Sequence, residues 1–92
     1  MNLFKLTFTN PVASVAVYAG PNMDRGNDPI TTLTAYDASN TAVDTDTAVS
    51  LYPNTLTATS ATNNIKYFTI ATDDFGAQLG IAFTNIVWGC AA

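Results

Sequence analysis

Alternation of apolar and polar residues runs through almost the whole chain, and it constrains the fold more than any other feature. Near the start, Phe4, Leu6 and Phe8 alternate with Lys5 and Thr7. Successive side chains of a β-strand point to opposite faces, so a period of two predicts strands with one buried face. The pattern recurs at residues 14–18, 32–36, 43–51, 55–60, 67–70 and 81–88. Because no segment of about ten residues keeps a helical period, the chain is expected to be all-β.

Proline, glycine, aspartate and asparagine separate these segments at intervals of about 8–12 residues. Asn10-Pro11 is expected to end the first strand, and residues 20–29 form the longest predicted loop. Seven or eight short strands with such spacing are typical of a sandwich. The sequence therefore predicts one domain over residues 1–92, an antiparallel β-sandwich of jelly-roll type.

One turn and the last strand carry more specific signals. In the turn at residues 37–40, Asp37 is expected to cap a type I turn. Asn40 is expected to take the left-handed conformation that a hairpin bulge needs. The alternation changes phase at Thr84-Asn85, which predicts a β-bulge in the last strand. Trp88 then falls on the face predicted to be buried, so it is assigned to the core.

Composition excludes much chemistry. The chain has no His and no Glu, so a Ser-His-Asp triad, a Cys-His pair and the usual zinc sites are excluded. A carboxylate pair must be Asp–Asp, and Asp44 and Asp46 share a strand face that is expected to be exposed. A chain of 92 residues also offers no insertion that would build a pocket around them. We therefore expect a protein that is not an enzyme and has no catalytic residues.

Charge and hydropathy bound the partners. Three basic residues and a net charge of −4 leave no basic patch for nucleic acid. No run of about 18 apolar residues is present, so no membrane span is expected. The first residues already fit a strand, so no signal peptide is expected. A surface rich in Thr and Asn is typical of an extracellular protein. We therefore expect this domain to be part of a longer secreted chain.

Three tyrosines are the candidate ligand-binding residues. If the apolar positions of each strand face the core, Tyr18, Tyr36 and Tyr67 face outward. Tyr36 and Tyr67 are expected side by side, because their strands are neighbours in a jelly roll. Exposed rings flanked by Thr and Asn suit stacking on a sugar, whereas a cross-strand Tyr pair can equally well serve to stabilise the sheet.

The acidic loops are candidates for structural calcium. Asp24, Asn27 and Asp28 lie in one loop, and Asp73-Asp74 lies in another. Calcium binds carboxylate, amide and carbonyl oxygens, but the spacing matches no fixed calcium loop. Turn formation by Asp and Asn explains the same residues. Cys90 is the only thiol in these 92 residues, so it is expected to be a small apolar residue at the end of the last strand, a partner in an intermolecular bridge, or one half of a bridge to a segment of a longer chain.

Three segments resemble a known group of modules. They are FTNPVASVAVYAGPN (8–22), ITTLTAYDASN (30–40) and NIKYFTIATDDFGAQLGIAFTNIVW (64–88). They are similar to small jelly-roll β-sandwich modules of secreted bacterial surface proteins, including PEP-type sorting-signal proteins and domains like carbohydrate-binding modules. Asn40 replaces the usual Gly, and residues 82–85 replace a closing acidic phrase, which argues against a metal site there. The residues given after Trp88 do not fit a sorting signal, so we expect this chain to be part of a longer protein. The resemblance implies a secreted or cell-surface module.

Two functions remain open at this point. The first is a non-catalytic structural, adhesive or assembly module, with a protein partner or with self-association through weakly protected edge strands. The alternative is a carbohydrate-binding module that uses Tyr36 and Tyr67, with Tyr18 and with calcium support. A flat Thr array for ice binding is a distant third, because the Thr-x-Thr pairs fall on several strands without one period.

Overall fold

The computed structural model describes residues 2–21, 30–49, 54–73 and 81–91. These residues form seven strands: β1 (Asn2–Val12), β2 (Ser14–Pro21), β3 (Ile30–Tyr36), β4 (Ala42–Val49), β5 (Asn54–Thr59), β6 (Ile65–Asp73) and β7 (Ile81–Gly89). All strand pairs are antiparallel. The all-β class is therefore confirmed, while the jelly-roll type stays a prediction. The described part of the chain contains no helix with the length and apolar character to cross a membrane.

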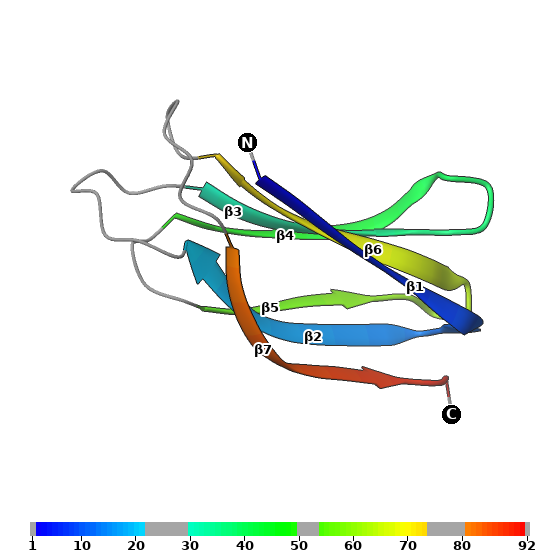
Figure 1. The fold of residues 1–92 in the computed structure, drawn as a ribbon. Coiled ribbons are helices and arrows are strands. Elements are labelled where there is room, and N and C mark those ends of the chain that lie inside the picture. The colour runs from blue at the N-terminus through cyan, green and yellow to red at the C-terminus, as the bar shows by residue number, and fades with distance from the viewer. Residues whose placement is uncertain (1, 22–29, 50–53, 74–80, 92) are drawn as a thin grey trace.

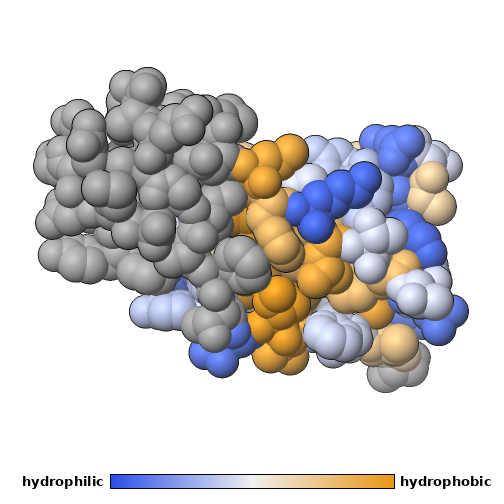
Figure 2. Space-filling view, in the orientation of Figure 1, coloured by the Kyte–Doolittle hydropathy of each residue, from blue (hydrophilic) through white to orange (hydrophobic). Residues whose placement is uncertain are grey.

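The strands form two layers (Figure 1). One sheet has the order β1-β6-β3-β4, and the other has the order β5-β2-β7. β3 and β6 are neighbours, as predicted. The edge strands are β1 and β4 in the four-stranded sheet, and β5 and β7 in the three-stranded sheet. Figure 2, in the orientation of Figure 1, shows apolar surface in the middle of the side on which β1 and β7 lie.

The first strand is longer than predicted. Asn10-Pro11 does not end it, because β1 continues to Val12. The register with β6 instead shifts between Thr7 and Val12. Proline lacks an N–H donor, and an irregular stretch of an edge strand tolerates that loss. Lys66 Nζ donates a hydrogen bond of 2.9 Å to the carbonyl oxygen of Thr9 in this stretch.

The two predicted turn features are confirmed. The N–H of Asn40 donates to the carbonyl of Asp37 at 3.0 Å, and the Asp37 carboxylate accepts from the N–H groups of Ser39 and Thr41. Asn40 has a φ of 65°, a left-handed conformation that Asn tolerates well. Thr84 pairs with Tyr18 and Val87 pairs with Ala16, so β7 has one more residue than β2 between these two pairs. Asn85, with a φ of 54°, lies in this predicted bulge.

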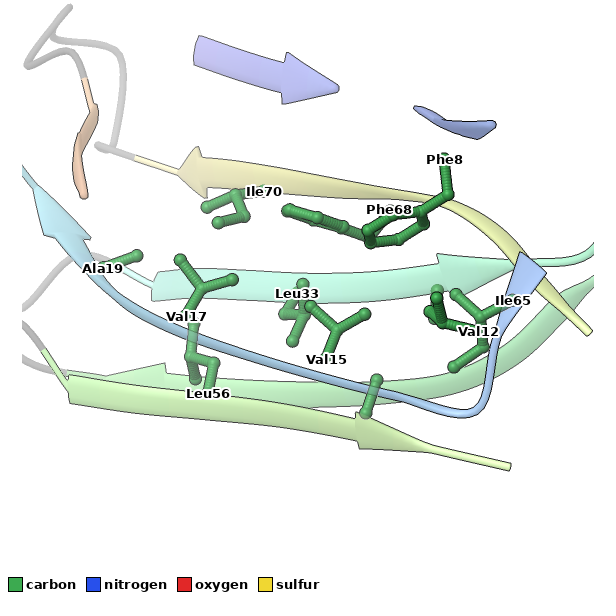
Figure 3. Packing of buried hydrophobic residues seen from close by; sticks show 12 residues of the cluster. Phe8, Val12, Val15, Val17, Ala19, Leu33, Leu56, Ile65, Phe68 and Ile70 are labelled. Atoms are coloured by element: carbon green, nitrogen blue, oxygen red, sulfur yellow. The ribbon is translucent and has the colours of Figure 1, made fainter. Parts of the chain in front are cut away.

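The core lies between the inner faces of the two sheets (Figure 3). Phe68 of β6 is fully buried, and its ring centroid lies 6.2 Å from that of Phe4 and 6.0 Å from that of Phe8. Val15 of β2 faces it from the other sheet, and Leu33 of β3 lies on the same inner face as Phe68. Each such side chain stabilises the fold by about 1.5–3 kcal/mol when it leaves water. The alternation that predicted the strands thus also marked most of the core.

The assignment of Trp88 to the core was wrong. Trp88 pairs in register with the buried Val15, so it is on the inward parity as predicted. Nevertheless 56% of the residue is exposed. β7 is an edge strand, so among the strands that the structure describes none covers its outer side. The indole still contacts Phe8, with a distance of 5.7 Å between ring centroids, and so helps to cover the core on the β1 and β7 side.

Two threonines are buried opposite each other on the inner face. Thr31 of β3 pairs in register with Thr72 of β6, and both are almost fully buried. Neither hydroxyl has a hydrogen-bond partner within the described ranges. A buried polar group without a partner costs about 1–3 kcal/mol. This end of the core is therefore less stable than its apolar neighbours would make it.

We predict that Thr72→Val raises the free energy of unfolding by about 1 kcal/mol, because valine has the same shape and no hydroxyl. Thr69→Val on the outer face of the same strand is the control, with a change below about 0.5 kcal/mol. Denaturant unfolding followed by circular dichroism measures both variants. A loss of stability in Thr72→Val would show that its hydroxyl does have a partner.

Candidate functional site

The structure brings two of the three candidate tyrosines together. Tyr36 of β3 and Tyr67 of β6 are direct register partners on the outer face of the four-stranded sheet. Their rings stack with centroids 4.8 Å apart and planes 14° apart. The hydroxyl of Tyr67 donates to Oδ1 of Asn40 at 2.9 Å. The hairpin that Asn40 shapes therefore also holds the tyrosine pair in place.

The stack leaves little ring face for a ligand. Lys5 Nζ lies 4.4 Å from the centroid of the Tyr67 ring. Lys5 comes from β1 and Tyr36 from β3, and these strands flank β6 on opposite sides. Both faces of Tyr67 are thus occupied, one by a cation and one by a ring. The outer face of Tyr36 is turned to β4, where its register partner is the small Ala42.

Tyr18 does not join this pair. It lies on β2 in the other sheet, with Thr55 of β5 and Thr84 of β7 as register partners. It is 41% exposed on the outer face of that sheet, so the thickness of the sandwich separates it from Tyr36 and Tyr67. A single surface that uses all three tyrosines is therefore excluded.

The predicted calcium ligands lie outside the described residues. Asp24, Asn27 and Asp28 fall within 22–29, and Asp74 falls within 74–80. Among the residues that the structure describes, no three His, Cys, Asp or Glu side chains gather as a metal site would require. Structural calcium therefore stays a prediction from the sequence.

Asp44 and Asp46 form a feature that sequence analysis missed. They were expected on an exposed face, but they share the half-buried face of β4 that is turned toward the other sheet. Oδ2 of Asp46 accepts a hydrogen bond of 2.9 Å from the N–H of Thr57 in β5. Oδ2 of Asp44 accepts one of 2.9 Å from the N–H of Thr59. We call these two carboxylates and their contacts the aspartate clasp.

The other oxygen of each carboxylate bonds to its own strand. Oδ1 of Asp44 accepts from the N–H of Thr45 at 2.9 Å, and Oδ1 of Asp46 accepts from the N–H of Thr47 at 3.0 Å. Two side chains thus satisfy four backbone donors, two on each of two edge strands. Hydrogen bonds to a charged acceptor contribute about 1.5–3 kcal/mol each when buried, and less at this half-exposed seam. Each of the four carboxylate oxygens thus accepts a backbone hydrogen bond, which suits a structural role.

A sequence signal for the clasp was present. Asp-Thr-Asp-Thr at 44–47 puts both carboxylates on one strand face. Inward-pointing charge is a device that edge strands use against unwanted pairing. The apolar Val43 and Val49 favoured the other face of the strand as the buried one. However, the register between β3 and β4 shifts beside Tyr36, so Val43 does not follow the alternation of the rest of β4.

The opposite side of the sandwich has a different character. β7 carries the exposed side chains of Val87 and Trp88, and β1 carries the exposed Leu3. No strand of the three-stranded sheet contains a charged residue. Lys5, Asp44, Asp46, Lys66 and Asp73 all belong to the other sheet. Cys90 follows β7 directly and is exposed, so it is not a core residue.

We predict that Asp46→Asn lowers the free energy of unfolding by about 1–2 kcal/mol. An amide offers one acceptor oxygen, so its NH2 group faces a backbone donor. Thr47→Asn introduces the same amide at the exposed neighbouring position, and it should cost clearly less. Denaturant unfolding checks both variants, and equal losses would contradict the clasp.

Comparisons of the chain with protein-family models, curated proteins and solved structures find no match. The suggested relation to secreted jelly-roll modules therefore stays a prediction from the sequence. The tyrosine pair, the aspartate clasp and the β7 edge are the features of the structure that bear on function.

Proposed function

We propose that this chain is a non-catalytic assembly or adhesive module of an extracellular or cell-surface protein. The observation that carries the proposal is the difference between its two sides. The aspartate clasp occupies the edges of β4 and β5. β7 is an uncharged edge strand with Val87 61% exposed and Trp88 56% exposed.

Strand edges explain why this difference bears on function. An edge presents unpaired N–H and C=O groups, which pair readily with another strand. Proteins that remain separate protect their edges with charges, prolines or bulges. Exposed Trp beside an apolar neighbour is also the side-chain chemistry that contributes most to protein interfaces. An uncharged edge that exposes Val87 and Trp88 beyond its bulge therefore supports association with a protein strand.

We predict that the mean mass of the isolated chain in solution rises with concentration under reducing conditions. Sedimentation velocity between micromolar and millimolar concentration measures it, and the reducing agent removes any contribution from a Cys90 disulfide. A strict monomer across this range would contradict self-association as the mode of assembly.

Carbohydrate binding is the second candidate, and one observation favours it. On the side away from Tyr67, the register partner of Tyr36 is the small Ala42, so no large side chain lies opposite the ring in register there. Thr34 and Thr45 lie on the same outer face, with their hydroxyl oxygens 3.4 Å apart. An open ring face beside hydroxyls suits a sugar. This candidate ranks second, because the ring of Tyr67 is already enclosed between Lys5 and Tyr36.

If the chain binds carbohydrate, Tyr36→Ala should abolish binding on a glycan panel while circular dichroism shows a folded domain. Tyr18→Ala, in the other sheet, is the matched control and should leave binding unchanged. The panel is run with calcium and then with EDTA, so that a contribution from Asp24, Asn27 and Asp28 becomes visible. Equal binding by the chain and by Tyr36→Ala would exclude this site.

A further inference from the structure

We propose that two copies of the chain join by antiparallel pairing of β7 with β7 of the second copy, centred on Val87. The inference rests on the proposed assembly function and names its partner and its contact surface. The two three-stranded sheets would then form one continuous six-stranded sheet. Three separate observations lead to β7, to a second copy and to this register.

The first observation is the protection of the other three edges. β4 and β5 are closed against each other by the aspartate clasp, which occupies the N–H groups of Thr45, Thr47, Thr57 and Thr59. β1 contains Pro11 and an irregular register between Thr7 and Val12, which disfavour pairing along that part of the edge, and its regular part carries the charged Lys5. β7 has neither a proline nor a charge. Its bulge lies at Asn85, so residues 86–89 form a regular stretch beyond it.

The second observation is the distribution of charge. Each copy has a net charge of −4, so two copies repel each other at most orientations. The three-stranded sheet carries no charged residue, and β7 is its free edge. A contact through β7 therefore places the uncharged sheets together and keeps Asp44 and Asp46 on the far side. The electrostatic repulsion between two copies is therefore smallest when they meet through β7.

The third observation is the match of side chains in one register. Paired residues of antiparallel strands point to the same face of the sheet, and a twofold axis through Val87 pairs that residue with its own copy. Val87 then meets Val87 on the outer face. On the inner face, Trp88 meets Ile86 of the second copy, twice by symmetry. Over residues 86–88 this register covers the exposed side chains of Val87 and Trp88 and pairs only apolar groups, and the next pair joins Asn85 to Gly89.

The test compares Val87→Lys with Val49→Lys. Val87 and Val49 are exposed to 61% and 60%, and both lie on edge strands, so the substitutions are matched in type and exposure. Val87→Lys places two like charges directly opposite each other and should raise the dissociation constant by about tenfold or more. Val49→Lys should leave it unchanged. Sedimentation velocity measures both, and thermal unfolding confirms that both variants are folded.

A charge-swap mixture makes the test specific to the register. Val87→Asp alone should also fail to associate, because it too opposes like charges. Mixing Val87→Lys with Val87→Asp pairs opposite charges and should restore a dimer of one copy of each. Failure of this rescue, with both variants folded, would overturn the pairing centred on Val87.

Spin labels on Cys90, the only cysteine, give the strand direction. Antiparallel pairing centred on Val87 puts the two Cα atoms of residue 90 roughly 20 Å apart, and parallel pairing puts them about 5 Å apart. A pulsed electron-resonance distance near 20 Å supports the proposal, and any clearly different distance overturns it.

The outcomes separate this inference from the proposed function. If the chain associates but Val87→Lys associates equally well, the assembly function stands and the β7 contact is wrong. The same conclusion follows if Val49→Lys weakens association as much as Val87→Lys. If the chain stays monomeric at every concentration, both self-association and the β7 contact are wrong.

Discussion

The aspartate clasp is the interaction on which the asymmetry of this molecule depends. A two-sheet sandwich has four strand edges, and each edge carries backbone groups that need partners. Asp44 and Asp46 satisfy four of these donors with two side chains, and they link β4 to β5 across the sheets. The clasp holds the sheets together along one side without a connecting ladder, and it fills that side with acceptor oxygens. On the opposite side, where β1 and β7 lie, the indole of Trp88 packs against Phe8, and the N–H of Ala13 donates a hydrogen bond of 2.8 Å to the carbonyl of Gly89.

This asymmetry favours association through one side of the sandwich, the side on which β7 lies. One side is closed by charge, and the other presents an uncharged strand with an indole and a valine at its surface. The outer face of the four-stranded sheet is organised differently, by the Lys5–Tyr67–Tyr36 stack and its hydrogen bond to Asn40. In that stack both faces of the Tyr67 ring are covered by Lys5 and Tyr36 and are not available to a sugar. We therefore rank the assembly proposal above the carbohydrate proposal.

Local rules predicted the features that depend on neighbouring residues. The left-handed Asn40, the capping carboxylate of Asp37 and the bulge at Asn85 all follow from short-range backbone geometry. Local rules failed where a neighbour from another part of the chain decided the outcome. Asn10-Pro11 is absorbed in an irregular edge strand, because β6 continues to pair beyond it at Val12. Trp88 has the inward parity that alternation predicts, but parity does not reveal that β7 is an edge.

The sequence by itself determined the all-β class, the positions of most strands and the side chains of the core, because the period of two in a strand is a property of the backbone alone. It also placed Tyr36 and Tyr67 on neighbouring strands. Only the tertiary structure decided that their rings stack on each other and that Tyr18 lies on the other sheet. The tertiary structure alone likewise decided that Asp44 and Asp46 reach β5 and that β7 stays uncovered. The physical reason is that strand order sets which edges meet, and strand order arises from contacts between residues far apart in the chain.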